Sequence, residues 1–314
     1  MRDLQRRLAA AGFAPVGAHP GAYCPVTEAA VRSFQTARGL RASGTCDEQT
    51  WLALVEAGWR LGDRLLMLTA PQLRGDDVAQ LQTALSHLGF DCGRPDGIFG
   101  PATMHALQDF QKNGGLSVDG ICGPRTGRML EVLSRQSGSG PGVASLRENE
   151  AMLAGRGSLP SLRIVVGQFG GLSSIARAVA RALRQGGASV MSTDEYEAPA
   201  QASAANRFGA SAYIGFEAVV GADSTVSYFA VPTFESVGGR SLADRVVRSL
   251  APTLEGSISL QGMRLPVLRE TRMPAVLCSL GPVRQVVDAT DAIAAAIYDA
   301  VADWASSPMT VPST

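Results

Sequence analysis

Histidine is scarce in this sequence and is missing from its larger part. The chain of 314 residues has three histidines, and these are His19, His87 and His105. Histidine is the commonest protein ligand of transition metals and the usual general base near neutral pH. The residues after His105 therefore hold neither a histidine metal site nor a serine–histidine pair.

The sequence also has no net charge and no long apolar run. The 28 Lys and Arg residues balance the 28 Asp and Glu residues, so the formal net charge at pH 7 is zero. A chain without excess positive charge does not hold nucleic acid by bulk electrostatics, and we expect no nucleic-acid partner. No apolar run approaches the roughly 20 residues of a membrane-spanning helix, so we expect no membrane span.

An export signal is not recognisable at the first residues. The sequence opens MRDLQRRL, which already follows the pattern of an amphipathic helix. We therefore expect a cytoplasmic protein. The alternative is a cell-wall protein whose start has been misassigned.

The stretch Asp96 to Gln111, DGIFGPATMHALQDFQ, belongs to an internal duplication. Leu4-Gln5, Gly12-Phe13 and Phe34-Gln35 recur as Leu81-Gln82, Gly89-Phe90 and Phe110-Gln111. In both copies, turn dipeptides separate short segments whose apolar residues follow helical spacing. The sequence therefore predicts a tandem repeat of two small all-α bundles, over residues 1–57 and 75–133.

Both copies resemble the peptidoglycan-binding three-helix module of many wall hydrolases. The family's pattern, LQ..L...GF, then DG.FG..T..A...FQ, then GL..DG..G..T...L, covers nearly all of both repeats. The resemblance implies binding of a muropeptide-like ligand at the turns and the grooves that they line. The candidate ligand-binding residues are Asp96, Gly97, Phe99, Gly100, Thr103, Gln111, Asp119 and Gly120. The first copy reads GAYCPVT without the Asp-Gly turn, so we expect binding mainly in the second.

Four of the five cysteines lie in the repeats, Cys24 and Cys46 in the first and Cys92 and Cys122 in the second. Four cysteines allow three pairings, and the duplication favours one disulfide within each repeat. The alternative is four free, partly buried thiols. Cys278 follows an apolar run and is expected to be a small buried residue.

The remaining segments divide the chain further. Residues 58–74 are too apolar for a loose linker and are expected to pack between the bundles. Residues 134–160 form a linker, with a flexible RQSGSGPG stretch and a short helix over 144–153. Residues 306–314 are polar and are expected to be a disordered tail.

From Leu162 onward, short apolar runs alternate with amphipathic segments. The predicted strands are 162–166, 189–191, 212–216, 226–231 and 275–279, and the predicted helices are 173–185, 200–208, 239–250 and 289–304. This alternation is typical of an α/β domain with a mostly parallel sheet, here over residues 161–305. The chain is thus predicted to be multidomain, with two three-helix bundles followed by this α/β domain.

The α/β segment resembles the zinc-dependent N-acetylmuramoyl-L-alanine amidase domain. The matching stretches are the glycine turn at Gly170-Gly171, AANRFGASAYIGFEA from Ala204 and LPVLRETRMPAVLCSLG from Leu265. In that family two histidines and a glutamate hold zinc, and another glutamate is the general base. Here Phe169 and Glu217 stand at the two histidine positions, and Ser279 stands at the position of the base. The segment that would carry the ligand glutamate is missing before Leu172. We therefore expect no metal, no cofactor and no catalytic residue.

The whole layout resembles actinobacterial amidase-like regulators of peptidoglycan precursor synthesis. The resemblance implies a non-catalytic pseudoenzyme with peptidoglycan fragments or precursors as ligands. It also implies partners such as a precursor-synthesis enzyme or a lipid-linked precursor flippase. In that family a phosphorylated tail switches partners, and this tail offers Thr310, Ser313 and Thr314.

Two other functions stay open at this stage. One is a peptidoglycan-hydrolysing amidase with an unusual site, and the other is an exported wall-binding protein with disulfides.

Overall fold

The computed structural model describes the chain except residues 137–140, 155–156 and 308–314. The predicted flexible linker lies partly outside this range, and the tail residues Thr310, Ser313 and Thr314 lie wholly outside it. Two compact units divide the chain. One holds residues 1–146 with 231–234, and the other holds residues 147–230 with 235–314.

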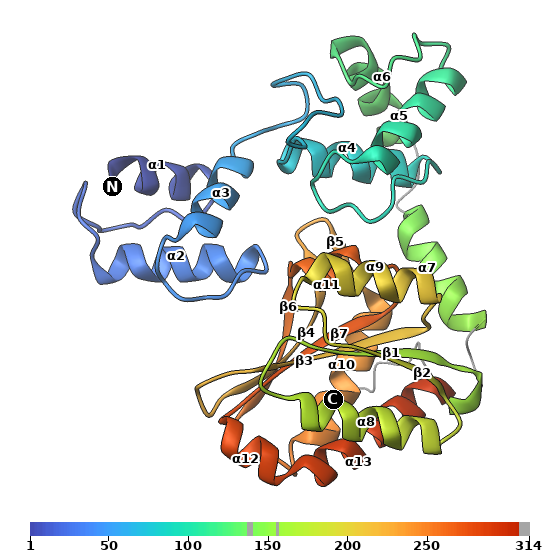
Figure 1. Cartoon of the computed structure of the whole chain (residues 1–314). Coiled ribbons are helices and arrows are strands. Elements are labelled where there is room, and N and C mark those ends of the chain that lie inside the picture. The colour runs from blue at the N-terminus through green and yellow to red at the C-terminus, as the bar shows by residue number, and fades with distance from the viewer. Residues whose placement is uncertain (137–140, 155–156, 308–314) are drawn as a thin grey trace. The chain divides into compact units, whose positions relative to one another are not determined.

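Six helices build the two bundles of the first unit (Figure 1). They are α1 Arg2–Ala10, α2 Pro25–Ala37, α3 Glu48–Glu56, α4 Asp76–His87, α5 Pro101–Asn113 and α6 Pro124–Gln136. In each bundle, the apolar residues at helical spacing form a separate core, as amphipathic helices require. Leu8 and Phe34 are fully buried in the first core, and Leu85 and Phe110 are buried in the second.

The segment between the bundles packs on the second one. Leu66 is fully buried in the core of the second bundle and forms an isolated β-bridge with Cys122. Leu61 and Leu73 pack against the same core. The high apolar content of residues 58–74 therefore reflects contacts with the second bundle.

The second unit is an α/β domain with a seven-stranded sheet. Its strands are β1 Arg163–Gln168, β2 Ser189–Thr193, β3 Ala212–Ala218, β4 Ser224–Val231, β5 Phe234–Glu235, β6 Ile258–Met263 and β7 Ala275–Leu280. The strand order is β2-β1-β3-β7-β4-β5, and β6 pairs with β4. Strands β2, β1, β3 and β7 run parallel, whereas β4 is antiparallel to β7. The mostly parallel α/β fold is thus confirmed.

The helices of this unit cover both faces of the sheet (Figure 1). They are α7 Val143–Ala154, η1 Leu159–Ser161, α8 Ser173–Gln185, α9 Ala198–Phe208, α10 Val237–Leu250, α11 Pro266–Glu270, α12 Val283–Asp288 and α13 Thr290–Ser306. Helices α8, α13 and α10 pack in a row, and the apolar faces of all three join one core with Ile164, Ile214 and Val276. The next residues along these strands face the other way, where α9 and α11 pack together.

Helix α7 belongs to the α/β unit for most of its length. Met152 is buried in the core of that unit, and Glu148 is buried and accepts a hydrogen bond from Ser236 at the start of α10. The short helix that the sequence predicts over 144–153 is present. Its packing shows that the α/β core begins earlier than the predicted boundary at 161.

No helix among the described residues combines the length and the apolar character needed to cross a bilayer.

Candidate functional site

A buried glutamine holds the first turn of the second repeat. Gln82 on α4 accepts a hydrogen bond from Gly97 N–H at its Oε1 (2.8 Å), and its Nε2 donates to Ile98 O and Thr103 Oγ1, each at 3.0 Å. Its side chain is almost fully buried, and all these groups are satisfied inside the bundle. Gly97 has a positive φ of 76°, a conformation that glycine adopts without strain.

A second glutamine holds the second turn in the same way. Gln111 on α5 accepts from Gly120 N–H (2.9 Å) and donates from Nε2 to Asp119 Oδ1 (2.7 Å) and Ile121 O (3.1 Å). Asp119 also accepts from Ile121 N–H, and this hydrogen bond, followed by that from Gln111, lowers the pKa of the Asp119 carboxyl. The turn is therefore a closed set of hydrogen bonds.

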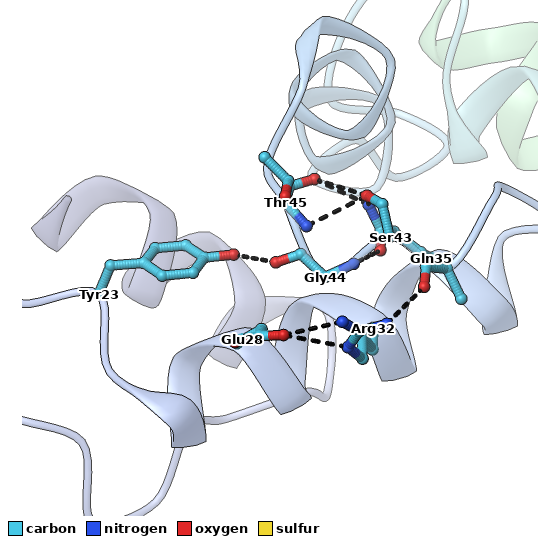
Figure 2. A network of polar contacts seen from close by, with 8 residues as sticks. Tyr23, Glu28, Arg32, Gln35, Ser43, Gly44 and Thr45 are labelled. Carbon is cyan, nitrogen blue, oxygen red and sulfur yellow. Dashed lines mark hydrogen bonds and ion pairs between the residues drawn. The ribbon is translucent and has the colours of Figure 1, made fainter.

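The first repeat contains the same two contacts. Gln5 accepts from Gly21 N–H and Gln35 accepts from Gly44 N–H, both at 2.8 Å. We call this arrangement, a glutamine amide bound to a glycine turn, the glutamine clamp. Figure 2 shows the clamp of Gln35, with Ser43 in the place of Asp119 and with the Tyr23 hydroxyl donating to Gly44 O.

The missing Asp-Gly turn of the first repeat is replaced without loss of shape. Pro20 stands where the second repeat has Asp96, and Gly21 has a φ of 84° against 76° at Gly97. In the turn, Gln5 binds only main-chain groups, the Gly21 N–H and the carbonyls of His19 and Ala22, so this clamp forms without an aspartate. The sequence alone does not show this equivalence.

The predicted ligand-binding residues mostly serve the clamps. Phe99, Thr103 and Gln111 are at most 1% exposed, and Gly97 and Gly120 are also buried. Phe99 belongs to the apolar core. Asp96 and Gly100 are half-buried, and Asp119 is the only exposed member of the predicted set. Most of these residues thus shape the surface that a ligand would meet, because buried side chains do not touch a ligand themselves.

The surface next to the second turn differs between the repeats. In the first, Gly44 lies against Glu28 and Arg32, which form an ion pair at 2.8 Å (Figure 2). In the second, Gly120 lies against the side chains of Met104 and Gln108. The two repeats therefore share a backbone frame and present different chemistry beside it.

All five cysteines are free thiols in the structure, as in the second of the two alternatives that the sequence leaves open. The Cys92 Sγ donates instead to Gln82 O at 3.2 Å, and the Cys24 Sγ lies 3.6 Å from Thr27 Oγ1. Burial raises the pKa of the Cys92 and Cys122 thiols to about 12. Buried thiols of this kind are poorly reactive, since the thiolate is the reactive form.

The three amidase-like positions meet at the carboxyl ends of the parallel strands. Glu217 on β3 is the register partner of Ser279 on β7, and Ser279 Oγ donates to Glu217 Oε1 at 2.5 Å. Phe169, which follows β1, donates its backbone N–H to Phe216 O on β3. We call Phe169, Glu217 and Ser279 the strand-end cluster. In open α/β sheets this edge is the usual place for a ligand.

The strand-end cluster does not fit a catalytic zinc ion. Such an ion takes three protein ligands and one water, whereas this cluster offers a single carboxylate, that of Glu217, and the Phe169 side chain has no atom that could bind a metal. Leu172 directly precedes α8 and is fully buried, so no ligand-bearing segment stands before the helix. Among the described residues, no three His, Cys, Asp or Glu side chains form a group that could bind a metal.

Sequence reasoning found the positions of this cluster but missed the hydrogen bond inside it. That bond joins two residues that are 62 positions apart in the chain, and it depends on the register between β3 and β7. The glutamine clamps were also missed. Their signal was present, because Leu-Gln and Phe-Gln pairs recur at equivalent positions of both repeats.

Comparisons with known proteins agree with the repeat structure. Residues 1–54 and 74–130 each match the family described as "Putative peptidoglycan binding domain".

One relative extends along most of the chain, and others match parts of it. The chain is 34% identical over 308 residues to the N-acetylmuramoyl-L-alanine amidase CwlM of Mycobacterium tuberculosis, with 87% of this chain and 75% of that protein covered. It is 37% identical over 150 residues to a probable N-acetylmuramoyl-L-alanine amidase of Bacillus licheniformis, with 42% of each chain covered. The amidase Ami1 of Mycobacterium smegmatis covers 48% of this chain and 100% of its own at 14% identity, with a TM-score of 0.41.

Proposed function

The chain belongs to the family of N-acetylmuramoyl-L-alanine amidase-like proteins that carry peptidoglycan-binding modules, and we propose that it is a non-catalytic member that regulates wall synthesis. In this proposal the two bundles bind peptidoglycan fragments or precursors. The α/β domain is kept as an interaction surface for a protein of precursor synthesis or transport.

One observation carries the non-catalytic part of the proposal. The strand-end cluster consists of Phe169, Glu217 and Ser279, and Glu217 accepts a hydrogen bond from Ser279. It lies at the edge of the sheet where the amidase family has its metal ligands and its base. A water bound by a metal needs open coordination and a base to remove its proton. Neither requirement is met by Phe169 and Ser279. The lack of histidine after His105 supports the same part of the proposal.

Zinc content and hydrolysis test this part together. The purified full chain should contain less than about one tenth of a zinc ion per chain, since three ligands are needed for tight binding. It should release no stem peptide from purified sacculi, with or without added zinc. A catalytic amidase of the family, assayed in parallel, controls for the substrate. One zinc per chain, or release of free stem peptide, would show that the chain is an amidase with an unusual site.

Binding and regulation need separate measurements. Titration with soluble muropeptides should give saturable binding to the full chain, and a capture experiment from the native host should enrich precursor-synthesis enzymes or a flippase. A chain that binds no muropeptide and enriches no such protein contradicts the proposal.

The proposed location is the cytoplasm. The free thiols support it, because disulfides are rare in that compartment. Fractionation of the host with titration of the thiols checks this point. Recovery in the wall fraction with oxidised cysteines would favour an exported wall-binding protein.

A further inference from the structure

A cavity of about 430 Å³ opens in the α/β unit, between α9 and the turn that joins α11 to β7. We call this cavity the α9 pocket. It is lined by Pro199, Ser203, Asn206, Arg207, Glu270 and Arg272. Figure 1 shows α9 and α11 side by side. At about 3.3 Å per residue, the chain from Arg272 to Ser279 spans roughly 20 Å, so this pocket is separate from the strand-end cluster.

The backbone of the pocket is held firmly by one side chain. Asn206 on α9 donates from Nδ2 to Glu270 O (2.8 Å) and accepts at Oδ1 from Arg272 N–H (2.9 Å). Both groups of this amide are therefore used to fix the turn against α9. Thr271 and Met273, on either side of Arg272, are buried. The exposed Arg272 thus projects from a segment whose backbone is anchored on both sides, so binding orders the side chain and not the backbone.

The charges of the pocket do not cancel. Glu270 is paired with Arg269 at 2.5 Å, which leaves this couple neutral. Arg207 donates to the hydroxyl of Ser203 at 2.8 Å, and neither Arg207 nor Arg272 has a carboxylate partner in the described part of the chain. Guanidinium groups stay protonated in proteins. The pocket therefore carries two uncompensated positive charges.

Stabilisation of α9 by a cation at its C-terminus explains the position of Arg207 but not that of Arg272. Arg207 lies in the last turn of α9, where a cation interacts favourably with the helix dipole. Arg272 lies outside any helix, and this explanation does not apply to it. The two arginines and Ser203 surround one cavity, and together they offer mostly hydrogen-bond donors.

We propose that the α9 pocket binds the phosphate group of a small phosphate ester. Two guanidinium groups match the charge of a phosphate monoester, which is about −1.5 to −2 at pH 7, and they can bind its oxygens in bidentate fashion. A carboxylate carries a single charge and matches one arginine. The pocket is open to solvent, and its volume of about 430 Å³ leaves room for an organic group beside the phosphate. This site is independent of the proposed wall function.

Calorimetric titration of the full chain tests the proposal with defined probes. Glucose 1-phosphate should bind saturably, whereas glucose should not bind, and inorganic phosphate should compete. Arg207→Gln and Arg272→Gln should each weaken binding by about tenfold or more, since each removes charge-assisted hydrogen bonds. The matched control is Arg177→Gln, which removes the same charge from an exposed position of α8 and should change affinity by less than about twofold.

Thermal melts of each variant confirm that the fold is intact before affinities are compared. Equal weakening by Arg177→Gln would show that bulk charge and not the pocket binds the probe. Binding of citrate with no binding of either phosphate would assign the pocket to carboxylates and overturn the proposal. Absence of binding by any phosphate probe at millimolar concentration would overturn it as well.

Discussion

The hydroxyl of Ser279 donates a hydrogen bond to the carboxylate of Glu217 across two neighbouring parallel strands, with 2.5 Å between the oxygens. This contact ties together two positions that carry a base and a metal ligand in the resembled amidase domain. A short hydrogen bond between a hydroxyl and a carboxylate is among the stronger ones in proteins. A hydroxyl–carboxylate hydrogen bond thus occupies this edge of the sheet.

Loss of this contact should destabilise the α/β unit. Ser279 is 8% exposed, and Ser279→Ala should lower the free energy of unfolding by about 1–3 kcal/mol, because a carboxylate oxygen loses its donor in a partly buried place. Urea unfolding measures the change. Ser189→Ala on the exposed start of β2 is the control and should be close to neutral. A neutral Ser279→Ala would show that water replaces the hydroxyl at no cost.

The glutamine clamps should matter more than ordinary surface glutamines. Gln82→Ala removes the partners of Gly97 N–H, Ile98 O and Thr103, and should cost about 2–4 kcal/mol from the buried groups left unsatisfied. Gln108→Ala on α5 deletes the same side chain where it is half-exposed, and should cost less than about 1 kcal/mol. Chemical denaturation of both variants makes the comparison. Equal costs would contradict a structural role for the clamp.

Alanine substitutions at two glycines of the first repeat distinguish the cost of backbone strain from the cost of steric clashes with neighbouring side chains. Gly12 and Gly44 both have positive φ, at 90° and 76°, but a Cβ at Gly12 would meet nothing within 4 Å. A Cβ at Gly44 would lie 2.7 Å from Arg32 Nε and 2.9 Å from Glu28 Cγ. Gly12→Ala should cost about 1–2 kcal/mol from φ alone, and Gly44→Ala should cost about 1 kcal/mol more. Thermal unfolding of both variants tests the order, and the reverse order would refute it.

Acid should weaken the second turn of the second repeat. The pKa of Asp119 is lowered from 3.8 in the folded chain, chiefly by the Ile121 N–H. A lowered folded pKa contributes stability that is present above the unfolded pKa and is lost as pH falls through the folded pKa. Asp119→Asn should therefore flatten the loss of melting temperature below about pH 4. Asp109→Asn on the exposed side of α5 removes the same charge and is the control. It should leave the dependence of melting temperature on acidic pH unchanged.

The second repeat should bind muropeptides more tightly than the first. Its Asp96 accepts from Ile98 N–H at 2.9 Å and keeps a carboxylate beside the turn, whereas the first repeat has Pro20 there. Titration of the full chain with Asp96→Ala and with Pro20→Ala compares the two turns. The first variant should lose the larger part of the affinity. A larger loss from Pro20→Ala would reverse the assignment.

The sequence predicts elements well where its pattern is long, and fails where the element is short. The helices from Ser173 and over 239–250 were predicted because their apolar residues recur over three turns. Strand β5 has two residues, and α11 and α12 have five and six, too few for a period to be visible. Strand β6 was missed because ISLQGM breaks its apolar pattern with glutamine and glycine.

The candidate site was predicted at the level of positions and missed at the level of contacts. Phe169, Glu217 and Ser279 could be placed from their stretches, but the register that joins the last two is a property of the folded sheet. The α9 pocket was not predicted at all. Arg207 and Arg272 are far apart in sequence, and the amide of Asn206 that brings their segments together resembles any helix asparagine until the turn is seen.

Each glutamine clamp accepts a hydrogen bond from a glycine N–H, and this main-chain contact is the same although the side chains around it differ. Pro20 and Asp96 occupy equivalent places over turns of nearly the same φ, and Glu28 and Arg32 replace Met104 and Gln108 without disturbing the glycine that rests on them. A duplicated module built in this way can change its ligand by surface substitutions while the residues that determine its fold stay the same. Tandem copies are then free to specialise, and a designer could redirect one copy and leave its twin as an internal reference.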